Sequence, residues 1–270
     1  EMSEEETEKR VMKLFDSISH LPGDPSYHLY YRCGVAMVEK EVEFAILADM
    51  GKMAQRMGRR QNVSEVHFYT KEMRDEQVRG EQLKAYLDTA IANDEFVVYF
   101  QPKYNILTEE IVGAEALVRW NYKKQGLMFP NQFIPVFEQD ESIGKVDREV
   151  LRKVCEKMKY WKDNGYPLFP VSVNLSPCEI GRTNLVEELV EIVKSYDVDP
   201  ELIDFELTES ADYNDKEYLL KVLEEIRKAG FMLSMDDFGT GYSSLSLLKD
   251  MPLNTLKIDK SFVDCILAEN

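Results

Sequence analysis

Acidic side chains gather in and just after short apolar segments in the part of the chain that follows residue 95. With one asparagine and one lysine in similar places, they are Glu115, Asn174, Glu206, Glu209, Asp236, Asp237, Lys257 and Asp259. Carboxylates directed at one point repel one another, and a divalent cation is the simplest compensation. Because Asp, Glu and Asn offer hard oxygen ligands, this set favours magnesium, manganese or calcium. All three histidines precede residue 70, which disfavours a zinc site of the usual His or Cys kind in the rest of the chain.

Three acids lie inside apolar segments. Along residues 203–207, apolar residues alternate with Asp204 and Glu206, so both acids point away from the apolar face of the expected strand. Glu115 stands between Ala114 and Ala116 in another apolar segment. A single acid at a strand end is more often a helix cap or a surface residue than a ligand. A carboxylate within a buried strand is costly unless it is paired or binds a cation, so the whole group indicates a metal site.

Two glycines and three serine or threonine side chains follow Asp237, in residues 238–245. Such a segment can bend sharply and offer backbone N–H groups. A GxG pattern alone is a weak signal, but directly after paired aspartates it predicts a mobile segment that positions metal ligands.

Strand-like segments alternate with amphipathic helical patterns from Glu95 onward. The predicted strands are residues 96–100, 111–120, 171–175, 203–207, 231–235 and 255–258. The predicted helices are residues 147–161, 178–196 and 216–228. This alternation is typical of βαβ units, so we expect an α/β fold with a mainly parallel sheet, either doubly wound or most of an eight-stranded barrel.

One helix start is marked by Ser176-Pro177-Cys178-Glu179. An N-cap Ser, a Pro at the first helical position and a Glu three residues after the Ser predict a capping box. Asn174 then falls at the carboxyl end of the preceding strand, which is the edge where parallel α/β folds build their sites.

The first 70 residues predict a small αβ segment. We expect strands over residues 27–38 and 63–69 and a helix over residues 43–57. Residues 71–93 predict a charged helix with one apolar stripe, which suits a rigid connector and the start of the next domain equally well.

Composition excludes several classes of protein. The chain has 270 residues, enough for one large or two smaller domains, and a formal net charge of -17. That charge argues against binding a nucleic acid polymer, although a bound metal would still allow a small anionic ligand. No apolar run approaches the roughly 20 residues that span a bilayer, and no signal peptide is visible.

The four cysteines lack CxxC spacing and favour free thiols in a reducing, cytoplasmic compartment. Because the chain begins with Glu1, we expect a fragment, whose upstream part could hold a membrane anchor or a sensor.

Several motifs in the same order resemble one family. Residues 95–264 closely resemble the EAL domain of bacterial cyclic di-GMP phosphodiesterases. The matching stretches are Gln101-Pro102, Glu115-Ala116-Leu117-Val118-Arg119-Trp120, Phe133-Ile134-Pro135, Val173-Asn174-Leu175-Ser176, Glu206-Leu207-Thr208-Glu209-Ser210, residues 236–245 and Leu256-Lys257-Ile258-Asp259. The resemblance implies a modified (βα)8 TIM-like barrel whose first strand runs against the others. It also implies hydrolysis of cyclic di-GMP to pGpG with Mg²⁺ or Mn²⁺, and inhibition by Ca²⁺.

The resemblance further implies roles for single residues. The implied metal ligands are Glu115, Asn174, Glu206 and Asp236, with Asp237 at a second metal. Glu115 also counts as catalytic, together with Lys257, which resembles the lysine that contacts the catalytic water, and Glu209, which resembles the glutamate that anchors the loop after Asp237. The implied substrate contacts are Gln101, Leu117, Arg119 and Ser176. Dimers are common in this family, so a homodimer through the EAL domain is an open expectation.

Residues 1–70 resemble, more weakly, the closing β-α-β segment of a GGDEF domain, without the GGDEF signature. The expected domains are therefore 1–70, a linker helix over 71–93, and an EAL domain over 94–270. EAL domains continue with two more strands that carry a further glutamate, so we expect a parent phosphodiesterase and a fragment that is weakly active or inactive. The alternatives are a non-catalytic cyclic di-GMP receptor and a different metal-dependent barrel enzyme.

Overall fold

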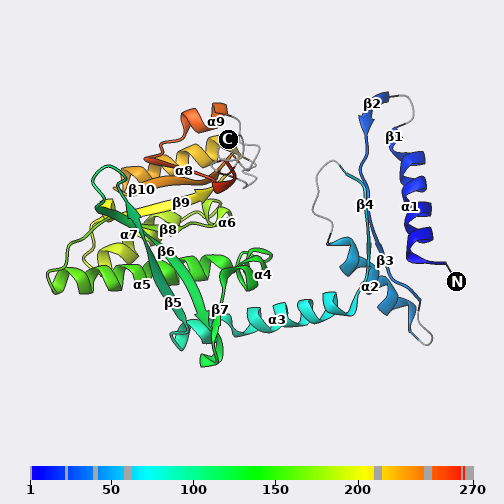
Figure 1. Ribbon diagram of the computed structural model, residues 1–270, viewed down its shortest axis with the longest axis horizontal. Helices are drawn as coiled ribbons and strands as arrows, with labels where there is room; N and C mark the ends of the chain where they lie inside the picture. Colours follow the sequence, from blue (N-terminus) through cyan, green and yellow to red (C-terminus); the bar gives the residue numbers. More distant parts are fainter. Residues whose placement is uncertain are drawn as a thin grey trace. The chain divides into compact units, whose positions relative to one another are not determined.

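The computed structural model describes residues 2–21, 24–38, 42–57, 63–209, 215–239, 245–262 and 264. The chain forms two compact units, Glu1–Gln82 and Leu83–Asn270, and each is described by itself (Figure 1). Helix α3 (Lys71–Ala92) contains the boundary between them. Its last turns bury Leu83, Leu87 and Ala90 in the core of the second unit. The predicted apolar stripe therefore belongs to that core.

The first unit combines short strands with two helices. In chain order it contains α1 (Glu4–Ile18), β1 (His20–Leu21), β2 (Asp24–His28), β3 (Arg32–Val35), α2 (Phe44–Gln55) and β4 (Glu65–Phe68). Strands β3 and β4 are parallel and are joined through α2. A Cβ atom on Gly34 would lie 1.8 Å from the carbonyl oxygen of Gly51, so α2 packs directly on the backbone of β3. The single strand predicted over residues 27–38 is wrong, because β2 and β3 belong to separate sheets.

The second unit is built on a seven-stranded sheet. Its strands are β5 (Phe96–Tyr104), β6 (Ile111–Asn121), β7 (Leu127–Met128), β8 (Val171–Asn174), β9 (Ile203–Thr208), β10 (Met232–Phe238) and β11 (Thr255–Ile258). The order is β11-β10-β9-β8-β6-β5, with β7 paired to β6. Strands β6, β8, β9, β10 and β11 are parallel, whereas β5 is antiparallel to β6. All six predicted strands are present, and the expected reversed first strand is β5.

Helices cover the outer face of this sheet (Figure 1). They are α4 (Ile134–Glu138), α5 (Ile143–Asp163), α6 (Pro177–Ile180), α7 (Leu185–Ser195), α8 (Lys216–Lys228) and α9 (Leu245–Asp250), with 3-10 turns at Tyr122–Lys124, Pro130–Gln132 and Pro200–Leu202. The prediction of α8 is confirmed at both ends. The single helix predicted over residues 178–196 is wrong, because the polar segment 181–184 separates α6 from α7.

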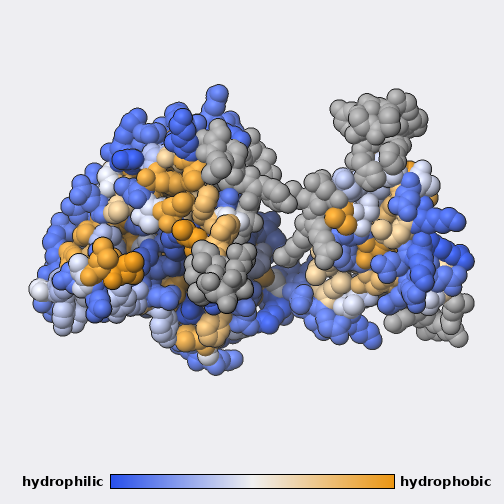
Figure 2. All heavy atoms as spheres, turned by 45° about the horizontal axis from the view of Figure 1, so that its top comes forward, coloured by the Kyte–Doolittle hydropathy of each residue, from blue (hydrophilic) through white to orange (hydrophobic). Residues whose placement is uncertain are grey.

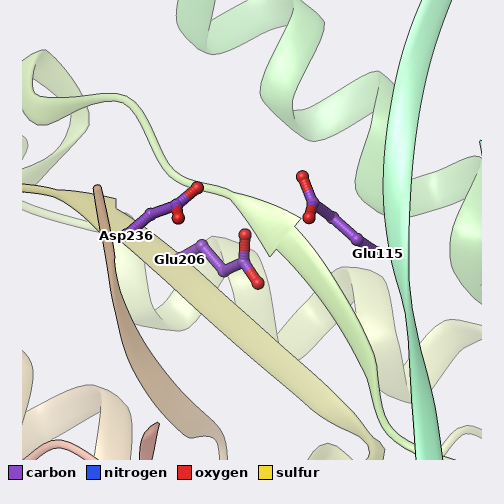
Figure 3. A group of neighbouring side chains, drawn as sticks. All are labelled: Glu115, Glu206 and Asp236. Carbon is purple, nitrogen blue, oxygen red and sulfur yellow. The ribbon is translucent and has the colours of Figure 1, made fainter. Parts of the chain in front are cut away.

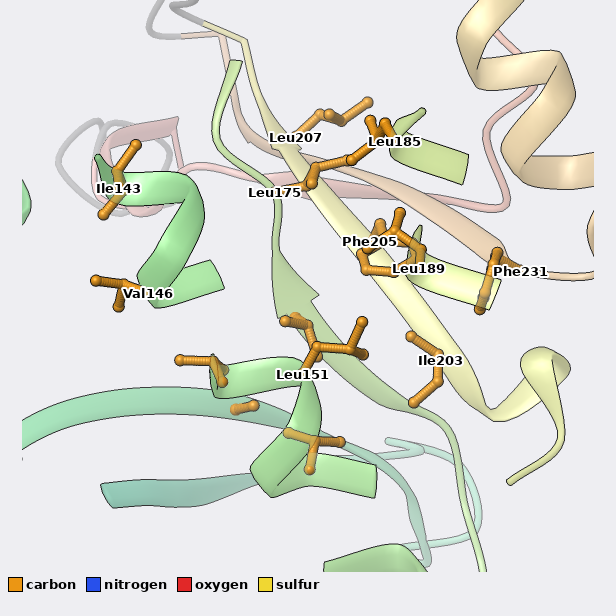
Figure 4. Close-up of a cluster of buried hydrophobic side chains, with 14 of the residues drawn as sticks. Ile143, Val146, Leu151, Leu175, Leu185, Leu189, Ile203, Phe205, Leu207 and Phe231 are labelled. Carbon is orange, nitrogen blue, oxygen red and sulfur yellow. The ribbon is translucent and has the colours of Figure 1, made fainter. Parts of the chain in front are cut away.

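The apolar core lies between the sheet and these helices. Figure 4 shows Leu151 of α5 and Leu189 of α7 beside the side chains of Ile203 and Phe205 from β9. Each of these four side chains is at most 3% exposed. The opposite face of β9 carries Asp204 and Glu206, as strand alternation requires. The sheet thus turns an apolar face to the helices and a polar face to the interior of the barrel-like curve.

Apolar side chains also reach the surface of each unit, where they are mixed with hydrophilic ones (Figure 2). Ile106 and Leu107, in the turn between β5 and β6, are 91% and 89% exposed. None of the described helices is both long and apolar enough to cross a membrane.

Candidate metal centre

Three carboxylates from three strands converge on the polar face of the sheet. Glu115 lies in β6, Glu206 in β9 and Asp236 in β10 (Figure 3). One oxygen of each carboxylate lies within 4.8 Å of the oxygens of the other two. Glu206 is buried and its two neighbours are half-buried. This is a set of hard oxygen donors at a spacing that one divalent cation could bridge.

Lys257 of β11 points into the same cluster. Its Nζ atom lies 3.0 Å from Glu115 Oε2, 2.7 Å from Glu206 Oε2 and 3.0 Å from Asp236 Oδ2. Burial lowers the pKa of Lys257, but hydrogen bonds to these three carboxylates outweigh burial and raise the pKa above its ordinary value. Lys257 is therefore an ammonium group, and it compensates the negative charge at the point where a metal ion would do so.

A second lysine contacts the same glutamate from another strand. Lys103 Nζ of β5 donates to Glu206 Oε1 at 2.8 Å and also to the hydroxyl of Ser172. Burial raises the pKa of Glu206, yet hydrogen bonds from Lys103 and Lys257 hold this pKa below its ordinary value. Glu206 is therefore ionised although its side chain is fully buried.

The remaining predicted ligands lie around this cluster. Asn174 is the last residue of β8, as predicted, and pairs in register with Glu206, so both side chains leave the sheet on the same face. Asp237 is exposed and has a positive φ of 54°. Burial, followed by the neighbouring charges of Asp236 and Asp259, raises the pKa of Asp237. Asp237 is not among the three converging carboxylates.

Glu209 contacts the beginning of the segment that follows Asp237. It is 4% exposed, and its Oε2 atom accepts a hydrogen bond of 2.5 Å from the backbone N–H of Gly239. Gly239 has φ 102°, and a Cβ atom there would lie 2.0 Å from the Phe262 ring, so this position requires glycine. The mobile segment predicted after Asp237 lies largely outside the described residues, at positions 240–244.

Three predicted substrate contacts share the face that carries Glu115. Gln101 of β5 is the register partner of Glu115, while Leu117 and Arg119 follow Glu115 at two-residue steps along β6. The Arg119 guanidinium lies 5.9 Å from the ring centroid of Tyr99 and 5.2 Å from that of Phe129. An arginine between two half-exposed aromatic rings can bind a phosphate while its flat faces stay packed.

The turn from β8 into α6 differs from the predicted capping box. Ser176 is the N-cap residue, but its side chain makes no capping hydrogen bond. Glu179 instead contacts Arg148 and Arg182, because its carboxylate is buried and needs cationic partners. The backbone N–H of Ser176 donates to Asp147 at 2.9 Å. Burial raises the pKa of Asp147 to about 7.

Comparison with known proteins identifies the family. The sequence profile of the EAL domain matches residues 84–270. This chain belongs to the EAL domain family. Its Glu115-Ala116-Leu117 segment, which carries a converging carboxylate, lies in the middle of β6.

Relatives of this EAL domain occur in several bacteria. The chain is 33% identical over 237 residues to the signaling protein YkoW of Bacillus subtilis, covering 86% of this chain and 29% of the relative. It is 35% identical over 183 residues to the bifunctional diguanylate cyclase/cyclic di-GMP phosphodiesterase MucR of Pseudomonas aeruginosa, covering 68% and 27%. The chain thus spans less than a third of either protein. The solved complex of the PaMucR phosphodiesterase with c-di-GMP has a TM-score of 0.63 at 35% identity, covering 70% of this chain and 76% of that one.

Two polar residues of the EAL domain were missed by the sequence analysis. Lys103 follows Gln101 by two residues in β5, so strand alternation could have placed it on the same face as the predicted substrate contact. Asp147 lies on α5, and no motif marks it as a partner of Ser176. Only the folded arrangement brings that helix against the end of β8.

Proposed function

We propose that this EAL domain hydrolyses cyclic di-GMP to pGpG with Mg²⁺ or Mn²⁺. The observation that carries the proposal is the convergence of Glu115, Glu206 and Asp236 around Lys257. The cyclic di-GMP phosphodiesterase activity in the name of MucR, and the c-di-GMP in its solved complex, support the choice of substrate. The activity of any longer protein that contains this domain belongs to the same proposal.

The residues of the cluster fit a divalent cation in chemistry and in charge. Glu115, Asp204, Glu206 and Asp236 carry four negative charges, and Lys103 and Lys257 carry two positive ones. The formal net charge of this set is minus two, which one divalent cation would balance, and Asp237 outside the set offers a further carboxylate for a second ion. We propose that Glu115, Asn174, Glu206 and Asp236 hold this ion and that Asp237 serves a second one. When bound, such ions supply an activated water and compensate the charge that develops on the phosphate.

The protein side chains have distinct tasks in this proposal. Lys257 would orient the attacking water and stabilise negative charge at the reacting phosphate. Arg119 contacts a phosphate oxygen, and Gln101, Leu117 and Ser176 contact the rest of the dinucleotide. Glu209 fixes the start of the segment after Asp237 through Gly239.

Turnover of cyclic di-GMP tests the proposal. The parent protein expected from the sequence is incubated with cyclic di-GMP and Mg²⁺ or Mn²⁺, and pGpG is followed by chromatography. We expect hydrolysis that Glu115→Ala abolishes and Ca²⁺ inhibits. The matched control is Glu109→Ala, which changes an exposed glutamate of the β5–β6 turn and should leave turnover unchanged. Absence of pGpG from the wild type, or equal turnover by Glu115→Ala, would refute catalysis at this centre.

A non-catalytic receptor is the second candidate. Calorimetry with cyclic di-GMP and Ca²⁺ measures binding without turnover. Incubation with Mg²⁺ then separates the two functions, because a receptor binds the dinucleotide and produces no pGpG.

We also infer that the first unit is the closing segment of a GGDEF domain. Its parallel β3–α2–β4 arrangement supports this assignment. Because the chain lacks the GGDEF signature, it should form no cyclic di-GMP from GTP.

A further inference from the structure

Lys103 is a half-buried cation without a task in the proposed chemistry. Its ammonium donates to Oε1 of Glu206 at 2.8 Å, whereas Oε2 of Glu206 contacts Lys257 at 2.7 Å. Lys257 is the group that also contacts Glu115 and Asp236. One oxygen of Glu206 therefore belongs to the acidic cluster, and the other belongs to Lys103.

A polar network on adjacent strands fixes the position of Lys103. The Ser172 hydroxyl accepts from Lys103 and donates to Asp204 Oδ2 at 2.7 Å. The Ser234 hydroxyl donates to the same carboxylate, at 2.8 Å from Oδ1 and 2.7 Å from Oδ2. Ser172, Asp204 and Ser234 are 2%, 5% and 0% exposed. Because buried polar groups must find partners, these contacts leave the ammonium little freedom.

We propose that Lys103 is a positioning residue of the metal centre, an inference that rests on the proposed function. Lys103 holds Oε1 of Glu206, so that Oε2 stays directed at Glu115 and Asp236. The network of Ser172, Asp204 and Ser234 in turn holds Lys103. Glu206 is the carboxylate most dependent on such contacts, because its side chain is 0% exposed while those of Glu115 and Asp236 are 19% and 21% exposed. Loss of a group that hydrogen-bonds to a metal ligand and orients it typically lowers metal affinity by about 10- to 100-fold.

Charge alone predicts the opposite effect of removing Lys103. The interior carries a net charge of minus two, and Lys103→Met would make it minus three. A more negative interior attracts a divalent cation more strongly. Positioning predicts weaker binding, because Glu206 loses the contact that sets its orientation. The sign of the change in affinity therefore separates the two roles.

Calorimetry with Mn²⁺ alone, without nucleotide, provides the test on the 270-residue chain. The variants are Lys103→Met and Lys103→Met/Asp204→Asn, and the second of these restores the net charge of minus two. We expect both to bind Mn²⁺ at least about 10-fold more weakly than the wild type. The matched control is Lys153→Met on α5, where a lysine side chain of 15% exposure pairs with Asp94 and Glu149. This control should bind Mn²⁺ as the wild type does.

Equal or tighter Mn²⁺ binding by Lys103→Met, or wild-type affinity in the double variant, would overturn the proposal, because Lys103 would then only balance charge. If either variant lacks the wild-type circular dichroism spectrum, Ser172→Ala decides, since it keeps every charge and removes one hydroxyl. We expect Ser172→Ala to bind Mn²⁺ at least about 3-fold more weakly, and unchanged affinity would reject a positioning role. No Mn²⁺ binding by the wild type would refute the metal centre itself, and this inference with it.

Discussion

Replacing Lys257 by methionine removes the ammonium that three carboxylates share. The side chains of Glu115, Glu206 and Asp236 are 19%, 0% and 21% exposed, so solvent offers little compensation for their charges. We expect Lys257→Met to destabilise the metal-free protein strongly. A divalent cation supplies the missing positive charge, so Mn²⁺ should raise the Tm of this variant by more than it raises that of the wild type.

The size of the effect follows from burial. Removing one partner of a buried ion pair costs roughly 3–5 kcal/mol, and Lys257 is itself 25% exposed, which favours the lower end, about 3 kcal/mol. For a domain of 150–250 residues, a loss of 1 kcal/mol lowers the Tm by about 2–4 °C. The Tm of metal-free Lys257→Met should therefore fall by about 6–12 °C.

Differential scanning calorimetry with and without Mn²⁺ measures both quantities, after chelation of residual metal. The matched control is Lys221→Met, because the Lys221 side chain is 72% exposed and lies 3.9 Å from Glu225. Such an exposed pair contributes less than about 1 kcal/mol, so the control should stay within about 4 °C of the wild type. A metal-free Lys257→Met protein with wild-type Tm, or one that gains no extra stability from Mn²⁺, would refute the counter-ion reasoning.

Two further predictions concern Glu95, which precedes β5, and Gly239, which follows β10. Glu95 is 2% exposed and accepts hydrogen bonds from Tyr86, Trp120 and Lys123, which outweigh burial and hold the pKa of Glu95 below its ordinary value. Its ionised form therefore stabilises the fold above the unfolded-state pKa, and this stability is lost as the pH falls through the folded-state pKa. Glu95→Gln should lower the free energy of unfolding by about 1–3 kcal/mol at pH 7 and by less at pH 4. Urea titration followed by tryptophan fluorescence measures this free energy. A difference between wild type and variant that is the same at both pH values would contradict the prediction. Gly239→Ala should reduce kcat/KM for cyclic di-GMP by about 10- to 100-fold, because the added Cβ meets Phe262 and displaces the backbone that Glu209 holds, whereas Mn²⁺ affinity should change little. Wild-type kcat/KM in Gly239→Ala would contradict the proposed role of Glu209 in positioning the segment after Asp237.

The positions of the strands and of the converging acids could be predicted from the sequence. Strand alternation depends only on neighbouring residues, so the sequence alone predicts Asp204 and Glu206 on the polar face of β9. The Pro177 start of α6 fixed the end of β8 at Asn174 for the same local reason.

Tertiary contacts decided the features that the sequence analysis missed. Glu179 fits a capping box, but Arg148 from α5 provides a charged partner for its buried carboxylate. The position of Lys103 depends on its hydrogen bond to Ser172, which is 69 residues away in the sequence. Helix α1 was not predicted, although Val11, Leu14, Phe15 and Ile18 recur at helical spacing, so here a local signal was present and was overlooked.

The most direct test of the metal centre is the anomalous scattering of crystals of this chain grown with Mn²⁺. We expect an anomalous peak within bonding distance of Glu115, Glu206 and Asp236, with Lys257 moved from its place among the three carboxylates. A peak elsewhere, or no peak while Lys257 still contacts all three carboxylates, would contradict a metal centre at this site.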